Sequence, residues 1–253
     1  MEQAIRALSW AIRLFWIMLI IFSVTVAYSL FMLLGNVEMR EPQFFASNGD
    51  ATVSLPFFIN NTSYYDMSDL NITTYVVYEE GATLCNSTTY EELIPKGSVL
   101  YGAHNVSINL NQTITNYSNL LFNDTYLNMH AFVSLKFAKV IPLQIAFNQT
   151  LEWGAPFYNF TLHQIFYNET TANATVLFGF ENHFFMDLNG TIQIRFYDDA
   201  GNPIGSGETD MQVPSHSPCQ QLIELSVTAK PETAHFYFQT DMFSFGPLRI
   251  HYG

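Results

Sequence analysis

Charged residues are scarce in this sequence. Only 12% of the 253 residues are charged, about half the usual share, yet the formal net charge is −13 and the chain has just four lysines. A nucleic-acid-binding domain needs a basic surface, so the composition argues against nucleic acid as a partner. The polar surface must instead be built mainly from Asn, Ser, Thr, Gln and Tyr.

Cysteine and the usual catalytic motifs are scarce as well. Cys85 and Cys219 are the two cysteines, and in an extracellular protein one disulfide and two free thiols are both compatible with them. The seven His residues lack the spacing of a zinc site, and neither a nucleophile elbow nor a phosphate-binding glycine loop occurs. The sequence predicts no catalytic, metal-binding or cofactor-binding residues and no cofactor, so we expect that the protein is not an enzyme.

Two acidic pairs precede glycine in the same context. Glu79-Glu80 is followed by Gly81, and Asp198-Asp199 is followed within two residues by Gly201. Acidic residues beside glycine are typical of a hairpin turn between strands. A calcium loop at Asp198, Asp199 and Asn202 stays open as an alternative, because carboxylate and amide oxygens are calcium ligands.

What the sequence does contain is one long uncharged run, residues 14–35 (LFWIMLIIFSVTVAYSLFMLLG). At about 1.5 Å per residue, a helix of this length covers about 33 Å, enough to cross a bilayer core. Trp16 and Tyr28 lie towards its ends, as aromatic residues do at membrane interfaces. A removable signal peptide has a shorter apolar region of about 7–15 residues. We therefore expect an uncleaved signal-anchor that contacts membrane lipid through residues 14–35.

Asparagine is abundant and often begins a glycosylation sequon. Thirteen of the 20 Asn residues start Asn-x-Ser/Thr, whereas the Ser and Thr content would give about three by chance. All thirteen follow the apolar run, so we expect a single-pass protein of the cell membrane with its carboxyl terminus outside. Asn60 and Asn61 overlap, and crowding should limit that pair to one glycan. The predicted glycosylation sites are Asn60, Asn61, Asn71, Asn86, Asn105, Asn111, Asn116, Asn123, Asn148, Asn159, Asn168, Asn173 and Asn189.

After the anchor, apolar and β-branched runs alternate with Asn, Asp, Gly and Pro, which is typical of short strands. Several runs recur in the same order; for example, Ala-Thr-Val at 51–53 recurs at 174–176. A repeat of this size is a whole β-sandwich. The expected organisation is a short cytoplasmic or interfacial segment over 1–13, a transmembrane helix over 14–35, a tether over 36–45, a first β-sandwich over 46–158 and a second over 159–253.

The repeat also predicts details of each copy. The stretch 113–122 is the one candidate helix in the first copy, and the second copy lacks this insert. Three pairs of corresponding residues are expected to face the cores, namely Val53 and Val176, Val77 and Phe196, and Ile145 and Ile250.

Both copies resemble the late embryogenesis abundant type-2 domain, also called the water-stress and hypersensitive-response domain. The residues that carry the resemblance are Ala-Thr-Val and an apolar strand ending in Asn (Asn60-Asn61 and Asn182), then a Tyr-rich strand, an acidic-glycine turn and a late Pro-Leu-x-Ile strand. The family's turn is typically Asn-Pro-Asn-like, and both copies here lack the proline. The resemblance implies an all-β fold of two tandem immunoglobulin-like or fibronectin-III-like sandwiches, linked to stress protection or membrane-associated defence, without catalytic residues.

Together these features predict a non-catalytic, glycosylated, membrane-anchored extracytoplasmic protein that contacts a cell-envelope or membrane protein partner. Two alternatives stay open. A pilin-like filament subunit also pairs an N-terminal apolar helix with an outer β-sandwich and would form a homo-oligomer; the other alternative is an accessory subunit of a larger membrane complex. Residues 191–253 contain no sequon, and 235–252 is rich in aromatics. Because glycans block close contact, we expect this stretch of the second sandwich to bind the partner.

Overall fold

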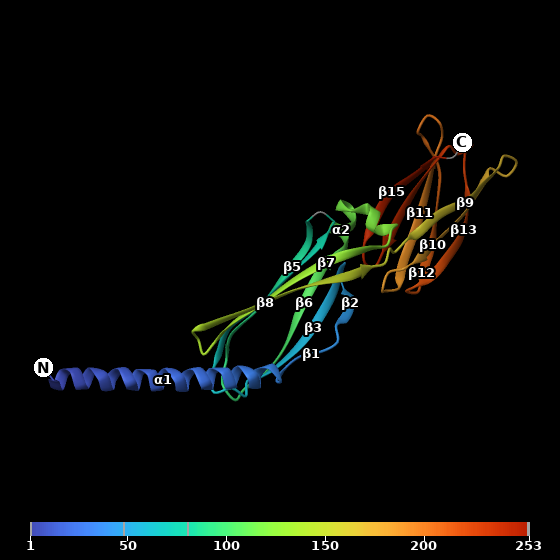
Figure 1. Ribbon diagram of the computed structural model, residues 1–253. Helices are drawn as coiled ribbons and strands as arrows, with labels where there is room; N and C mark the ends of the chain where they lie inside the picture. Colours follow the sequence, from blue (N-terminus) through green and yellow to red (C-terminus); the bar gives the residue numbers. More distant parts are fainter. Residues whose placement is uncertain (1, 48, 80, 252–253) are drawn as a thin grey trace.

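The chain is a long N-terminal helix followed by two immunoglobulin-like β-sandwiches, as predicted. The computed structural model describes residues 2–47, 49–79 and 81–251. Helix α1 (Glu2–Leu34) projects from one end, and the two sandwiches follow one another away from it (Figure 1). Its 29-residue segment Ile5–Leu33 has a mean hydropathy of 2.3 and is long and apolar enough to cross a membrane. The expected interfacial segment over 1–13 belongs to this same helix, apart from Met1, which lies outside the described residues.

The strands of the described residues are antiparallel and mostly long. They are β1 (Val37–Met39), β2 (Gln43–Ser47), β3 (Asp50–Asn60), β4 (Met67–Tyr78), β5 (Ala82–Ile94), β6 (Val99–Asn109), β7 (Thr125–Phe137), β8 (Ile141–Trp153), β9 (Tyr158–Asn168), β10 (Asn173–Asn182), β11 (Leu188–Tyr197), β12 (Pro203–Val213), β13 (Ser217–Ser226), β14 (Thr233–Thr240) and β15 (Ser244–His251).

The two sandwiches share one topology. In the first, a sheet of order β5-β4-β7-β8 faces a sheet in which β3 pairs with β6 on one edge and with β1 and β2 on the other. In the second, a sheet of order β12-β11-β14-β15 faces a sheet of order β13-β10-β9. Strands β2 to β8 thus correspond, in chain order, to β9 to β15. The predicted tandem repeat is confirmed by this match of strand order.

The tether expected over 36–45 is wrong. Residues Val37–Met39 pair with 57–59 of β3, and Gln43–Ser47 pair with 50–54. The first sandwich therefore begins three residues after α1 ends, well before residue 46. The second begins with β9 at Tyr158, next to the expected start at 159; residues 252–253 of the expected 159–253 domain lie outside the described residues.

The helical insert lies where the sequence placed it, with shifted bounds. Helix α2 (Leu110–Asn116) is followed by a 3-10 turn over Ser118–Leu121, in place of one helix over 113–122. Asn109 caps α2, because its side chain accepts a hydrogen bond from the Gln112 amide at 2.8 Å. The second sandwich has a short loop at the corresponding place, between β13 and β14.

The residues predicted to face the cores are buried or half-buried in the second copy, whereas in the first copy they are half-buried or exposed. Val176 and Phe196 are fully buried, and Ile250 is half-buried. In the first copy Val53 and Val77 are half-buried, and Ile145 is wrong, because its side chain is 66% exposed. Ile145 lies on β8, an edge strand with a neighbour on one side only.

Two apolar cores result. The larger core extends without a break from the end of the first sandwich that carries α2, through the junction, into the second sandwich. The smaller fills the α1-facing end of the first sandwich, where Leu33 of α1 packs with Phe57, Met67 and Phe137. The helix and both sandwiches are thus joined by buried apolar surface, the main stabilising term in folding.

Candidate functional site

A buried asparagine organises one loop of the first sandwich, between β3 and β4. Asn61 is 0% exposed. Its Nδ2 donates hydrogen bonds to the carbonyl oxygens of Tyr65 and Ile94, each at 3.0 Å. Its Oδ1 accepts from the Ser63 hydroxyl at 2.6 Å and from the Ser63 amide at 3.3 Å. A fully bonded buried amide of this kind fixes the course of the backbone.

The corresponding loop of the second sandwich, between β10 and β11, repeats this arrangement. Asn182 is also 0% exposed. Its Nδ2 donates to the carbonyl oxygens of Met186 (2.9 Å), Pro214 (3.1 Å) and Val213 (3.2 Å), while its Oδ1 accepts from the Phe184 amide at 3.0 Å. We call these two segments, 61–66 and 182–187, the asparagine loops.

An aspartate at the end of each asparagine loop completes the correspondence. Asp66 accepts a hydrogen bond from the Lys96 amide at 3.0 Å, and Asp187 accepts one from the Ser215 amide at 2.8 Å. Each bond ties the asparagine loop to the next loop at the same end of its sandwich. The internal scaffold is therefore the same in both copies, which leaves the outward side chains free to differ.

The first asparagine loop receives α1. The hydroxyls of Thr25 and Tyr65 lie 2.6 Å apart, and Ser29 Oγ accepts from the Tyr64 amide at 3.2 Å. The rings of Tyr28 and Tyr64 stack with centroids 6.0 Å apart. The last third of α1 is therefore fastened to the first sandwich rather than free beside it.

The second asparagine loop receives the segment that links the two sandwiches. The Trp153 and Phe184 rings lie 5.2 Å apart, and the His183 amide donates to the Ala155 carbonyl at 3.0 Å. Phe157 is fully buried, with its ring 4.4 Å from that of Phe238. The junction between the sandwiches is thus a packed interface and not a flexible linker.

An ion-paired histidine clamps this junction. His183 Nδ1 lies 2.7 Å from Asp124 of the first sandwich, and its Nε2 lies 3.1 Å from Glu181. Ionised carboxylates only accept hydrogen bonds, so the pairing requires a proton on both ring nitrogens. The hydrogen bond to Asp124 is the main cause that raises the pKa of His183, with Glu181 acting in the same direction. The ring also stacks on Tyr158 at 4.2 Å.

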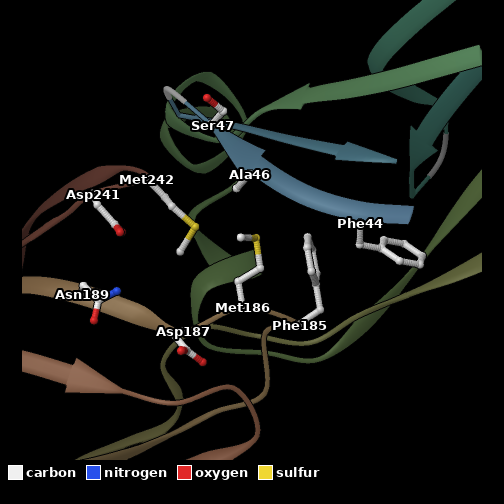
Figure 2. A pocket seen from close by; sticks show the side chains of 9 residues that line it. All are labelled: Phe44, Ala46, Ser47, Phe185, Met186, Asp187, Asn189, Asp241 and Met242. Carbon is white, nitrogen blue, oxygen red and sulfur yellow. The ribbon is translucent and has the colours of Figure 1, made fainter. Parts of the chain in front are cut away.

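Two cavities flank the second asparagine loop. Both are lined by Phe44 and Phe185, whose ring centroids lie 5.7 Å apart across the junction. One, shown in Figure 2, has a volume of about 570 Å³ and includes Asn189 of a sequon at its edge. The other, of about 890 Å³, includes His183. Among the described residues, no group of three or more His, Cys, Asp or Glu side chains is placed to hold a metal ion.

The sequon asparagines fall into three groups. Asn60 and Asn71 are half-buried. Asn61 is buried with its Nδ2 fully engaged, and because a glycan is attached through that atom, the folded chain does not present Asn61 as an acceptor. The exposed ones are Asn86, Asn105, Asn111, Asn116, Asn123, Asn148, Asn159, Asn168, Asn173 and Asn189.

The two cysteines are free thiols, so the alternative of a Cys85–Cys219 disulfide is not realised. Cys85 lies on β5 of the first sandwich and Cys219 on β13 of the second. Burial raises the pKa of the Cys85 thiol to about 11 and also raises that of Cys219. Thiols of this kind are protonated and poorly reactive.

The acidic turn of the second copy is a hairpin turn. The carboxylate of Asp198 accepts from the Asn202 amide at 2.7 Å and from Asn202 Nδ2 at 3.0 Å, between β11 and β12. The carboxylate that the calcium alternative would use thus already closes the turn.

His104, which the sequence did not single out, is buried between the hydroxyls of Thr74 and Thr89, at 2.9 Å from each, and burial lowers its pKa.

The outer face of the second sandwich carries a cationic row. Arg195, His235 and Arg249 lie side by side on β11, β14 and β15, and the positive charge of the row belongs to its two arginines. Burial and, after it, Arg249 and His251 lower the pKa of His235. The Arg195 guanidinium stacks over the Tyr237 ring at 4.8 Å. Phe236 and Phe238 of the same strand point into the core. The aromatic stretch 235–252 is therefore divided between the core and an outward face, as the alternation of a strand requires.

Sequence reasoning missed the asparagine loops and the clamp at His183. One signal was present: the strand-ending Asn recurs at 61 and 182, but only Asn61 belongs to a sequon. A residue that recurs without the sequon has a reason other than glycosylation. His183 follows directly after Asn182, but nothing in the sequence brings it to Asp124.

Comparisons with known proteins give distant structural similarities. No family model matches the chain, and no curated protein does. Solved structures with a similar arrangement include a red sea bream transglutaminase (11% identity, TM-score 0.30, 83% of this chain and 31% of that one). Others are the periplasmic chaperone SfaE (11%, 0.31, 85% and 97%) and a protein from Archaeoglobus fulgidus (10%, 0.32, 46% and 95%). This chain spans about a third of the transglutaminase's length.

Proposed function

We propose that this is a non-catalytic, glycosylated protein that α1 anchors in the cell membrane, with both sandwiches outside, and that it acts by binding a protein partner of the cell envelope. The helix Ile5–Leu33 supports the anchor. Ten exposed sequon asparagines support an extracytoplasmic location, since the acceptor side chains are accessible in the folded chain. The resemblance to water-stress and hypersensitive-response domains is part of this proposal and agrees with the tandem sandwich.

The observation that carries the binding role is the part of the outer face around Arg249, which is formed by residues of 191–253, a stretch without a sequon. The chain has a net charge of −13, yet this face presents Arg195, His235 and Arg249 in one row across three strands. Neither arginine of the row is in a salt bridge within the described residues. Exposed cations beside aromatic rings are common at protein interfaces, so the proposed partner presents an acidic surface.

A glycan placed on this face tests the proposal. Arg249→Asn with His251→Thr creates a sequon at two exposed positions of β15. The matched control, Arg249→Gln with His251→Thr, makes the same charge change without an acceptor. We expect that the glycosylated variant loses the partner from a detergent extract while the fold, followed by circular dichroism, is unchanged. Equal recovery with both variants and the parent would reject this face as the binding site.

A pilin-like filament subunit is the second candidate, and one observation favours it. The described side chains of 5–24 in α1 are exposed, so this half of the helix is free to bundle with other copies. Electron microscopy of the cell surface and the mass of the mature N-terminus distinguish the two. Filaments built from chains that begin near Leu14 would show that α1 forms the core of a filament and is not a membrane anchor. Stable co-purification with several different subunits would instead favour an accessory role in a membrane complex.

A further inference from the structure

The contact between α1 and the first sandwich begins inside the apolar run. Along α1 the side chains that become buried or half-buried are Thr25, Val26, Ser29, Leu30 and Leu33, a helical stripe that faces the sandwich. Contact extends one turn further back, because the Phe22 ring lies 5.9 Å from that of Tyr65. One face of the helix is therefore covered by the sandwich from Phe22 onward, although Phe31 on another face stays 74% exposed.

The part of the apolar run that lipid can surround on all sides is too short to cross a bilayer by itself. From Leu14 to Ile21, before the contact at Phe22, it contains eight residues, which is about 12 Å of helix. A bilayer core is about 30 Å thick. The missing length must come either from the residues before Arg13 or from the turns that the sandwich covers. In both cases the α1-facing end of the sandwich touches lipid: in the first it lies at the edge of the core, and in the second it enters it.

The loops at this end have the composition of a membrane-interface surface. The turn between β7 and β8 exposes Val140 (69% exposed), and the first asparagine loop exposes Tyr64 (62%). Three of the four lysines of the chain, Lys96, Lys136 and Lys139, lie in or beside the loops at this end. Tyrosine and lysine are the side chains that place an apolar part against lipid and a polar tip in the headgroup layer.

The polar backbone of these loops limits how deeply they can enter the bilayer. Irregular backbone cannot face hydrocarbon, since its amide and carbonyl groups would lose water. The ion pairs Lys136–Asp69 (3.0 Å) and Lys139–Asp66 (3.5 Å) are also exposed groups that need a hydrated setting. The headgroup layer satisfies both requirements, because it is hydrated and yet borders the acyl chains.

We propose that the α1-facing end of the first sandwich, formed by the loops 61–66, 95–98 and 138–140, is a lipid-contacting surface that sits in the headgroup layer beside α1. Figure 1 shows this end of the sandwich lying alongside the C-terminal part of the helix. The first sandwich is then held on the membrane, and the second is held away from it by the packed junction. The inference rests on the membrane anchoring of the proposed function.

Fluorescence quenching in nanodiscs of phosphatidylcholine tests this inference on the full chain. Cys85 and Cys219 are replaced by Ala, and single cysteines for an environment-sensitive fluorophore replace Val140, Ile17 or Leu222. Leu222 is the matched control, an exposed apolar residue of the second sandwich (56% exposed). Lipids carrying a nitroxide at the headgroup should quench the label at Val140→Cys several-fold more than the label at Leu222→Cys.

The label at Ile17→Cys distinguishes failure of the lipid-contacting surface from failure of the membrane anchor. Strong quenching at position 17 by acyl-chain nitroxides, with equal weak quenching at positions 140 and 222, would overturn the lipid-contacting surface and leave the anchor intact. Absence of quenching at position 17 would overturn the anchor and this inference together. Quenching at 17 by acyl-chain nitroxides and at 140 by headgroup nitroxides is the expected result.

Discussion

Replacing the buried asparagine of the second sandwich by aspartate is the sharpest test of the asparagine loops. Asn182→Asp keeps the shape of the side chain but removes both Nδ2 protons. An oxygen then faces the carbonyl groups of Met186, Val213 and Pro214, which now accept at 2.9–3.2 Å. Each buried polar group left without its partner costs about 1–3 kcal/mol, so the loss of two donors should lower the free energy of unfolding by about 2–6 kcal/mol.

The loss should depend on pH. Burial and the facing carbonyl groups favour the neutral acid, so the new carboxyl has a folded-state pKa above its unfolded value of about 3.9. The folded state then holds more protons than the unfolded state, and stability falls as pH rises through the folded-state pKa. The variant should therefore be closest to the parent in acid and weakest near neutral pH.

The assay is urea unfolding of the full chain in detergent, produced in a host without N-glycosylation so that no sequon is modified. Asn61→Asp should behave as Asn182→Asp does, because Asn61 makes the corresponding hydrogen bonds in the first sandwich. Asn86→Asp is the control, since Asn86 is exposed and a surface change there should stay within about 0.5 kcal/mol. The reasoning is refuted if the buried variants unfold at the same urea concentration as Asn86→Asp.

Four further outcomes are expected. Phe157→Ala should cost about 3–5 kcal/mol in urea unfolding, because it empties a fully buried site at the junction. Gly154→Ala should open the junction, seen as faster proteolysis between the sandwiches, since an added Cβ would lie 1.9 Å from the His183 carbonyl oxygen. In the parent, the stability that the protonated His183 clamp contributes should be fully present below pH about 6.5 and lost as pH rises through the raised pKa of His183. Thermal unfolding measured across this pH range should show that dependence for the parent and not for His183→Gln. Mass spectrometry of the natively glycosylated protein should find glycans at exposed sites such as Asn105 and none at Asn61.

The division into two sandwiches with corresponding strands could be predicted because the sequence repeats its apolar alternation and its turns. What failed was residue-level facing where the strands are irregular. A β-bulge at Asp69 (φ 54°) interrupts the pairing of β4 with β7 between Ser68 and Asn71, and beyond it the even-numbered residues of β4 face the core, so that Val76 is buried and Val77 is only half-buried. In the second copy, β11 is regular up to Phe196, and the prediction holds there. Bulges depend on pairing between strands and leave little trace in one segment.

Helix α1 shows a different limit of sequence reasoning. Hydropathy found the helix, because apolar runs of this length are rare in other settings. It treated all residues of the run alike, so Thr25 and Ser29 passed as tolerated polar residues in a membrane helix. Their spacing of four places them on one face, which is the face that bonds to Tyr65 and Tyr64. Small polar residues on one stripe of an apolar helix thus indicated a packed partner, but not which one.

The two asparagine loops explain how one scaffold joins three parts of the chain. In each copy the loop lies at the end of the sandwich where the preceding part of the chain arrives: α1 at the first, and the segment after β8 at the second. Asn61 and Asn182 hold the backbone from inside, so the outward positions are free to match their partner. Tyr64 is placed against Tyr28 of the helix, and its counterpart Phe185 against Phe44 of the first sandwich. A chain built in this way links the orientation of α1 to that of the second sandwich, and therefore to the direction in which the cationic row faces.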